Sequence, residues 1–309
     1  MKFVIFGSGG TGAVLGAYLS LCGEDVTFIA RGEHLEAIKE KGLLLKTGHR
    51  GDILLPKVKA CAANEYAEAA PDVIFVCVKY YSLDDAISFV RRAADKNTLV
   101  IPILNVYGTG EIMQEKLPGL FCLDGCIYVL ASIVAPGVIA EPQPILRVFY
   151  GFRPGEDRSL EKKAAELETI LKKAGIGGHF TDNIRRDALQ KFAFISPMGA
   201  AALYTDSVSH DFQKEGEPRR LFVGLVKEII AVGAAMGIVF ERDLVETGLK
   251  MLDGFKPDIT TSLQRDVLKG RPSEFDGLVG SVARLGQKYG VPTPLYDKIC
   301  QWGRERGVI

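Results

Sequence analysis

Six residues near the start of the chain have the types and the spacing needed to bind a dinucleotide. The pattern G-x-G-x-x-G stands directly after an apolar run at 2–6 and directly before a helical run at 13–21; its residues are Gly7, Ser8, Gly9, Gly10, Thr11 and Gly12. The first glycine permits a tight turn, the second lets the backbone approach a pyrophosphate, and the third lets the helix pack closely. The amide groups at the start of the helix then face the anion. A glycine-rich turn without a ligand is the alternative interpretation.

The end of the second expected strand discriminates between the two nicotinamide dinucleotides. A site for NAD usually places Asp or Glu about 20 residues beyond the glycines, where it accepts a hydrogen bond from the ribose 2′-hydroxyl. Here the strand leads into Arg31, whose guanidinium attracts a 2′-phosphate through two parallel hydrogen bonds. We therefore predict NADPH. The alternative is that Arg31 is a solvated loop residue and that Glu33 binds the ribose.

Four further polar residues are candidates for chemistry, although each also has an ordinary interpretation. Lys79 follows an apolar strand and is expected at the strand's carboxyl end, where open α/β sheets bind their ligands. The alternative is a lysine that caps the strand in solvent. Asn105 follows the next strand and is otherwise a turn residue that bonds its own backbone. Lys191 lies on a helix, facing either a substrate or solvent. Glu274 follows Ser273 at a helix start, where the helix dipole alone favours an acid.

The elements that must position these residues follow from the spacing of apolar residues. In the first half of the chain, short apolar runs alternate with amphipathic stretches, as in parallel strands connected by helices. The run at 73–78 is apolar at every position, which is typical of a strand covered on both faces. We therefore predict a Rossmann-like, doubly wound sheet. Its strands are expected at 2–6, 25–30, 72–78, 98–104, 120–128 and 145–150.

The second half of the chain has the periodicity of helices. A charged helical pattern at 155–173 is followed by a glycine-rich break at 175–178, and almost no alternating β-branched run remains beyond it. We predict an NADP(H)-binding domain over 1–182 and an all-helical substrate and dimerisation domain over 183–309. Small apolar residues at 233–235 suit either a homodimer interface or packing within one chain. The helices are expected at 184–204, 218–236, 242–252, 259–268, 274–289 and 294–302.

Composition narrows the class of partner. The chain has 309 residues, 47% of them hydrophobic, with 38 basic and 38 acidic residues, so no net charge favours nucleic acid or an anionic membrane surface. No segment approaches about 20 uninterrupted apolar residues, the length needed to cross a bilayer. The six cysteines and four histidines form no metal-binding spacing. These features predict a cytoplasmic protein with reduced thiols, no bound metal and a small-molecule substrate.

Taken together, the motifs resemble those of the ketopantoate reductase family. They occur in the family's order along essentially the whole chain. The matching segments are GSGGTG, Arg31, VCVKYYS with Lys79, ILNVYGTGE with Asn105, NIRRDALQKFAF with Lys191, TSLQRDVLKGRPSEFD with Ser262 and Glu274, and YGVPTP.

The resemblance implies a two-domain enzyme that reduces 2-dehydropantoate, a branched 2-oxo acid, to pantoate on the route to pantothenate and coenzyme A. NADPH would lie on the first domain and the substrate in the cleft between the two. Lys191 would be the general acid that protonates the C2 oxygen. Glu274 would hold the substrate hydroxyl, Ser262 would contact its carboxylate, and Asn105 with Lys79 would touch cofactor and substrate.

Three positions depart from the family pattern. Val106 follows Asn105 where the family commonly has glycine, and Ile195 and Gly199 stand where well-studied members present asparagines to the substrate. Ser196 is expected to compensate from a neighbouring position. Two alternatives therefore accompany the main prediction: an NADPH-dependent reductase of another 2-oxo acid, and an NADP(H)-binding sensor without catalysis.

Overall fold

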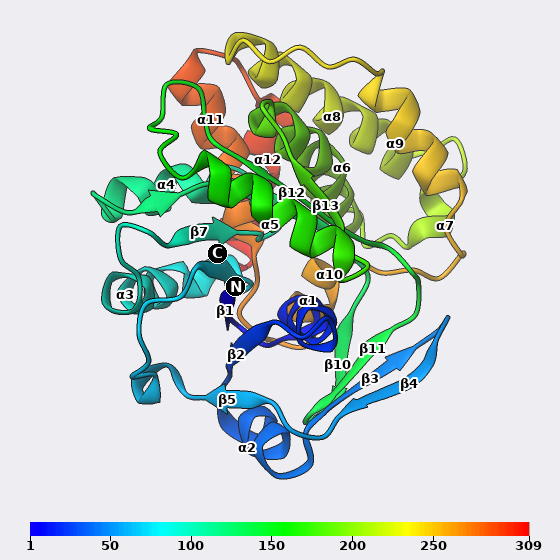
Figure 1. Ribbon diagram of the computed structural model, residues 1–309. Coiled ribbons are helices and arrows are strands. Elements are labelled where there is room, and N and C mark those ends of the chain that lie inside the picture. Colours follow the sequence, from blue (N-terminus) through cyan, green and yellow to red (C-terminus); the bar gives the residue numbers. More distant parts are fainter. Residues whose placement is uncertain (309) are drawn as a thin grey trace. The chain divides into compact units, whose positions relative to one another are not determined.

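The computed structural model describes residues 1–308, which form two compact units that are described separately (Figure 1). The first unit comprises Met1–Leu104 and Gly108–Ile184. The second comprises Asn105–Tyr107 and the chain from Arg185 onward. The main division thus falls after Ile184, two residues beyond the expected one, and a three-residue segment that follows a strand of the first unit belongs with the helices of the second.

A six-stranded parallel sheet is the framework of the first unit. Its strand order is β5-β2-β1-β6-β7-β8, and every neighbouring pair is parallel. The direction of winding changes between β1 and β6, and ligands bind at the carboxyl ends of strands at such a point. The predicted Rossmann-like sheet is confirmed. The strands are β1 (Lys2–Phe6), β2 (Asp25–Ile29), β5 (Lys59–Cys61), β6 (Val73–Val76), β7 (Leu99–Pro102) and β8 (Phe121–Cys122).

Helices and small sheets bury both faces of this sheet. Phe3 and Ile5 of β1 point into a core shared with α1 and α5, whereas Val4 and Phe6 point into a core shared with α3 and α4. Burying one such side chain contributes about 1.5–3 kcal/mol, so continuous apolar strands form here in place of alternating ones. The helices of this unit are α1 (Gly10–Leu21), α2 (Gly32–Lys41), α3 (Leu83–Ala93), α4 (Thr109–Lys116) and α5 (Glu161–Lys173).

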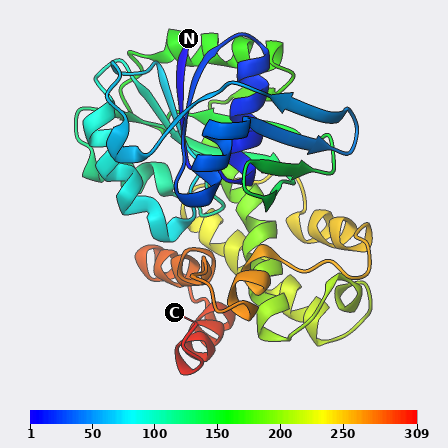
Figure 2. The ribbon, with the colours of Figure 1, turned by 90° about the horizontal axis from the view of Figure 1, so that it is seen from below.

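Two smaller sheets, with orders β10-β11-β3-β4 and β13-β12-β9, correct the expected single sheet. The strand expected at 120–128 is two strands in different sheets, and the one expected at 145–150 pairs antiparallel with β9. The break expected at 175–178 contains the start of β13, which forms by pairing with β12. Figure 2 shows the β3–β4 hairpin (blue) beside β10 and β11 (green). The strands are β3 (Leu43–Thr47), β4 (Gly51–Leu55), β9 (Asp124–Val129), β10 (Ser132–Ala135), β11 (Val138–Glu141), β12 (Leu146–Gly151) and β13 (Gly177–Phe180).

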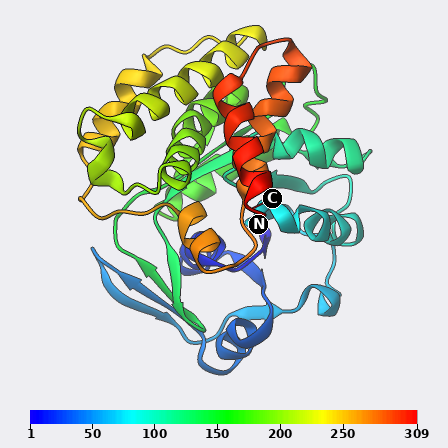
Figure 3. The ribbon, with the colours of Figure 1, turned by 180° about the vertical axis from the view of Figure 1, so that it is seen from behind.

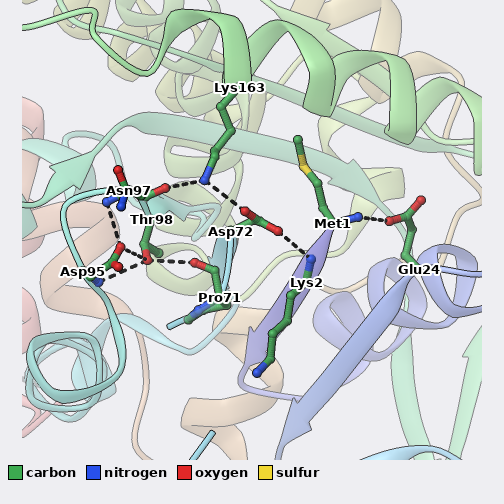
Figure 4. Close-up of polar contacts among 9 residues, drawn as sticks. All are labelled: Met1, Lys2, Glu24, Pro71, Asp72, Asp95, Asn97, Thr98 and Lys163. Atoms are coloured by element: carbon green, nitrogen blue, oxygen red, sulfur yellow. Dashed lines mark hydrogen bonds and ion pairs between the residues drawn. The ribbon is translucent and has the colours of Figure 1, made fainter. Parts of the chain in front are cut away.

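Hydrogen bonds close the amino edge of the parallel sheet (Figure 4). The Asp72 carboxylate, just before β6, accepts from the Lys2 amide at 2.9 Å and from the Lys163 ammonium at 3.0 Å. The same ammonium donates to the Asn97 carbonyl at 2.6 Å. Burial raises the pKa of Asp72, but the two donors outweigh it and hold that pKa below its usual value. The ionised carboxylate therefore joins β1, β6 and α5 at the edge opposite the glycine-rich turn.

The second unit confirms the predicted helical region, because all of its regular elements within the described residues are helices (Figure 3). The helix expected at 274–289 begins with a π-helical turn, Asp276–Gly280, and α7 was not predicted. None of the helices in the described part of the chain is long and apolar enough to cross a membrane. The helices are α6 (Ile184–Tyr204), α7 (Ser209–Phe212), α8 (Glu217–Ala235), α9 (Leu244–Asp253), α10 (Ser262–Leu268), α11 (Ser281–Tyr289) and α12 (Pro294–Glu305).

Aromatic side chains anchor α6 within this unit. The ring of Phe194 on α6 lies 5.9 Å from that of Phe222 on α8 and 5.9 Å from that of Phe255. Edge-to-face pairs of this kind add about 0.5–1.5 kcal/mol each to the burial of their area. Phe194 lies three residues after Lys191, so these ring contacts hold the part of α6 that carries Lys191.

The small residues at 233–235 bear on the expected homodimer. A Cβ atom on Gly233 would lie 3.0 Å from the Leu189 side chain and 3.1 Å from the Phe240 ring, both in the same unit. Gly233 therefore packs within the chain, which was the second of the two interpretations. The homodimer stays a prediction.

Candidate active site

The glycine-rich turn places the start of α1 directly against the sheet. Gly7 has a φ of +99°, a conformation that L side chains rarely adopt, and a Cβ atom there would lie 2.7 Å from the Val78 side chain. A Cβ atom on Gly12 would overlap the carbonyl oxygen of Gly7. Both positions therefore require glycine for the protein's own packing, as the motif predicts for its first and third glycines.

Gly9 has a different environment. A Cβ atom on Gly9 would meet no protein atom within 4 Å, so packing does not require a glycine there. The space above the turn is where the motif brings the pyrophosphate, next to the first amide groups of α1. No acidic residue stands in the first turn of α1. The residues present therefore fit a dinucleotide pyrophosphate.

The turn is held against the end of β2. The amides of Gly7 and Ser8 both donate to the carbonyl of Ile29, at 3.2 and 3.1 Å, and the Ser8 hydroxyl donates to the same oxygen at 3.0 Å. Arg31 follows two residues later as the exposed N-cap of α2. Its place beside the turn suits a 2′-phosphate contact. Glu33 is exposed as well, so the alternative assignment of the ribose contact stays open.

A histidine that no motif marks also contacts the turn. The Nε2 atom of His34 lies 2.8 Å from the Ser8 carbonyl oxygen, and its Nδ1 atom accepts a hydrogen bond from the Gly137 amide at 3.0 Å. Gly137 is more than a hundred residues away in sequence, in the turn between β10 and β11. Only the folded chain brings these groups together, which is why sequence spacing could not reveal the contact.

Lys79 lies at the carboxyl end of β6, as predicted. It is half-buried, and its carbonyl accepts a hydrogen bond from the Ser82 amide at 2.9 Å, which starts the short helix Tyr80–Ser82. The thiol of Cys77, two residues earlier, has its pKa raised by desolvation and stays protonated. This strand end therefore brings a cation, with no thiolate, to the edge that carries the glycine-rich turn.

Lys191 and Asn105 are joined within the second unit. Lys191 is only 7% exposed, and its Nζ atom donates to the Oδ1 atom of Asn105 at 2.9 Å. The Tyr107 ring lies 6.2 Å from that of Phe192, the residue after Lys191. An ammonium group is costly to bury unless polar partners surround it. The alternative that Lys191 faces solvent is therefore wrong. The alternative that Asn105 is only a turn residue bonding its own backbone is also wrong, because its side chain bonds Lys191.

Glu274 and Ser262 stand at the starts of helical segments. Glu274 is 3% exposed and immediately precedes Phe275, whose amide donates to the Ser273 hydroxyl at 3.3 Å. The helical segment has Phe275 as its N-cap and no side-chain cap, so Ser273 precedes the helix start instead of capping it. The Asp276 carboxylate, in the first turn, accepts a hydrogen bond from Arg284 at 2.7 Å. Ser262 is the half-buried first residue of α10. The substrate roles of Glu274 and Ser262 stay predictions.

The expectation that Ser196 compensates for Ile195 and Gly199 is wrong. Ser196 is fully buried, and its hydroxyl donates to the Leu278 carbonyl at 2.6 Å while lying 2.7 Å from the Tyr296 hydroxyl. Its single O–H is given to the Leu278 carbonyl and its side chain is enclosed by the protein, so Ser196 has no donor left for a substrate. A buried tyrosine beside a mid-helix serine was the missed partner, and sequence alone does not pair residues a hundred positions apart.

Family models match most of the chain. The model described as ketopantoate reductase PanE/ApbA matches residues 3–145, and the model of its C-terminal part matches residues 183–306. The chain belongs to the ketopantoate reductase family. It is therefore an oxidoreductase that acts on a CH–OH group, and the family resemblance of its motifs is confirmed.

Individual relatives extend over the full length. A 2-dehydropantoate 2-reductase from Mesorhizobium japonicum is 29% identical, covering 100% of this chain and 98% of its own. The crystal structure of a 2-dehydropantoate 2-reductase from Methylococcus capsulatus has a TM-score of 0.87 at 23% identity, over 100% and 97% of the two chains. D-mandelate dehydrogenase, in a ternary structure with NADH and anilino(oxo)acetate, has a TM-score of 0.85 at 24% identity, over 97% and 96%. The two structures show that the fold is shared.

Substitutions at two glycines test whether the turn holds a dinucleotide. Gly9→Ala adds a methyl group that meets no protein atom, so the melting temperature should stay near that of the unchanged protein. The same methyl group stands where the pyrophosphate is expected, so NADPH affinity in calorimetric titration should fall at least about tenfold.

Gly12→Ala is the matched control. Its methyl group overlaps the Gly7 carbonyl, so we expect a lower melting temperature, with a cost of about 1–3 kcal/mol for overpacking. Full NADPH affinity in Gly9→Ala would contradict the assignment of the turn to the pyrophosphate.

Proposed function

We propose that this member of the ketopantoate reductase family reduces 2-dehydropantoate to pantoate with NADPH, on the route to pantothenate and coenzyme A. The observation that carries the proposal is the buried Lys191 ammonium held by the Asn105 amide oxygen. Support also comes from relatives named 2-dehydropantoate 2-reductase that align with nearly the whole chain, such as those from Mesorhizobium japonicum and Pyrococcus horikoshii.

The first unit binds the cofactor in this proposal. The amides of the glycine-rich turn and the start of α1 hold the pyrophosphate, and the Arg31 guanidinium holds the 2′-phosphate. When bound, NADPH supplies the hydride that adds to C2 of the substrate. Lys79, at the end of β6, contributes a positive charge toward the cofactor and the substrate carboxylate.

Lys191 supplies the proton. As the hydride adds to C2, the electron pair of the C=O bond moves onto oxygen, and this oxygen takes a proton from the Lys191 Nζ atom. The Asn105 oxygen accepts a hydrogen bond from one of the three N–H groups of Lys191, which fixes the directions of the other two N–H groups. Burial strengthens the attraction between the ammonium and the developing alkoxide. The neutral amine is then reprotonated from solvent.

Glu274 and Ser262 bind the rest of the substrate. The carboxylate of Glu274 accepts a hydrogen bond from the substrate's hydroxyl, and the hydroxyl of Ser262 donates to the substrate's carboxylate. A hydrogen bond to a buried charged group is worth about 1.5–3 kcal/mol, so an analogue without the hydroxyl should be a poorer substrate.

A second candidate function is the reduction of a 2-oxo acid with an apolar substituent. It is favoured because Ser196 is occupied by Leu278 and Tyr296, while the neighbouring positions Ile195 and Gly199 offer no side-chain donor. A Cβ atom on Gly199 would lie 3.4 Å from Leu263, so apolar groups surround that position. The similarity of the fold to D-mandelate dehydrogenase is compatible with this candidate.

Steady-state kinetics on three substrates separates the two candidates. The purified protein is assayed with NADPH and 2-dehydropantoate, 2-oxoisovalerate or phenylglyoxylate. We expect kcat/KM for 2-dehydropantoate to exceed that for 2-oxoisovalerate by about 10- to 100-fold, because the latter lacks the hydroxyl that Glu274 binds. Equal or higher values for either apolar acid would contradict the main proposal and support the second.

Removal of the acid tests the mechanism. Lys191→Ala should lower kcat by about 10²- to 10⁴-fold, because the developing alkoxide loses its proton donor. The affinity for NADPH, measured by calorimetry, should change little, because the glycine-rich turn and Arg31 are untouched.

Lys227→Ala is the control, since Lys227 is an exposed lysine on α8 and its removal should leave kcat unchanged. Turnover that survives in Lys191→Ala would assign the proton to another group. An unchanged protein that binds NADPH and reduces no 2-oxo acid would instead support a cofactor-binding sensor.

A further inference from the structure

We propose that His34 is a positioning residue that holds the glycine-rich turn in its cofactor-binding shape by joining it to the turn between β10 and β11. The proposal rests on the proposed function, because it takes the turn to be the dinucleotide site. Its two contacts are the Ser8 carbonyl at 2.8 Å and the Gly137 amide at 3.0 Å.

The partners of the imidazole ring of His34 determine which ring nitrogen donates and which accepts. The Gly137 amide is a donor only, so the Nδ1 atom must present its lone pair. The Ser8 carbonyl is an acceptor only, so the Nε2 atom must carry the hydrogen. With these two partners the ring donates to one loop through Nε2 and accepts from the other through Nδ1.

The bond to Ser8 completes the attachment of this residue. The Ser8 amide and hydroxyl donate to the Ile29 carbonyl at the end of β2, at 3.1 and 3.0 Å. His34 binds the remaining backbone group of Ser8, its carbonyl, from the first turn of α2. One residue of the turn is thus tied to both β2 and α2.

The β10–β11 hairpin contacts the cofactor region at two points. A Cβ atom on Gly10 would lie 2.7 Å from the Ala131 carbonyl oxygen, so the chain entering β10 packs directly against the start of α1. A Cβ atom on Gly137, which has a φ of +72°, would lie 3.2 Å from Ala37 of α2. His34 is the polar connection between this hairpin and the turn.

This connection bears on binding because the turn is rich in glycine. Glycine backbones have the most conformational freedom to lose when a ligand orders them, and contacts that order them beforehand increase affinity. The pyrophosphate is common to NADPH and NADH, so loss of the His34 contacts should weaken both cofactors equally. Loss of Arg31, which is expected to read only the 2′-phosphate, should weaken NADPH more than NADH.

Calorimetric titration of four variants with NADPH and NADH tests the proposal. His34→Ala should weaken both cofactors by about tenfold, which corresponds to roughly two lost hydrogen bonds of ordinary strength. His34→Gln should recover most of the affinity, because its amide oxygen accepts and its amide nitrogen donates. Arg31→Ala should lower affinity for NADPH selectively, and His49→Ala, at an exposed histidine in the β3–β4 turn, should change neither.

Kinetics separates positioning from catalysis, and unfolding separates it from stability. His34→Ala should raise the KM for NADPH and leave kcat near that of the unchanged protein, with a similar melting temperature. Unchanged affinity in His34→Ala would overturn the proposal. So would a loss that His34→Gln fails to rescue, or one that accompanies a large fall in melting temperature. Failure of the unchanged protein to bind NADPH would overturn the proposed function itself.

Discussion

The close approach of α1 to the parallel sheet is the constraint on which the first unit depends. A Cβ atom on Gly16 would lie 2.5 Å from the Phe28 ring and 2.9 Å from Ile5, and one on Gly12 would overlap the turn itself. Because these positions lack side chains, the first turn of α1 reaches the carboxyl edge of the sheet at β1 and β6, where the direction of winding changes. The backbone amides at the helix start then stand beside the ends of β2 and β6, which bring Arg31 and Lys79.

A buried ammonium imposes the corresponding constraint in the second unit. Lys191 has only 7% of its surface exposed and requires acceptors, one of which is the side chain of Asn105. Asn105 follows β7 of the parallel sheet closely in sequence, yet the segment from Asn105 to Tyr107 packs with the helices. The chain therefore passes within a few residues from β7 of the sheet to Asn105, which accepts a hydrogen bond from the proposed acid, Lys191. Phe194 and its aromatic neighbours hold α6 in place around this pair.

Local signals made the cofactor half of the first unit predictable. The apolar run, the glycine spacing and Arg31 lie within about thirty residues, and the strand β1 and helix α6 were placed at their observed bounds. The two small sheets were not predicted as separate sheets. The segments that form β9 and β12 were expected in the main sheet, and β11 pairs with β3, which lies far away in sequence. The glycine-rich strand β13 lacks the apolar pattern of a covered strand. Strand β10 is largely apolar in sequence, yet all four of its residues are exposed.

Side-chain partners were harder to predict than elements. Ser196 was expected to face a substrate, and instead it joins α6 to the π-helical turn after Glu274 and to Tyr296 of α12. His34 was not considered as a site residue. Its ring bonds two backbone groups, and contacts with backbone groups leave no pattern of residue types in the sequence. Predictions from type and spacing succeed where the chemistry is local and fail where the fold supplies the partner.

In the proposed function, this chain moves a hydride from NADPH to C2 of 2-dehydropantoate. The most direct test uses NADPH with deuterium at both positions of the reduced nicotinamide carbon, and the pantoate formed is analysed by mass spectrometry and NMR. We predict that each pantoate molecule carries one deuterium, located at C2, and that no pantoate forms when the protein is left out. Pantoate without deuterium, or no pantoate at all, would contradict the account.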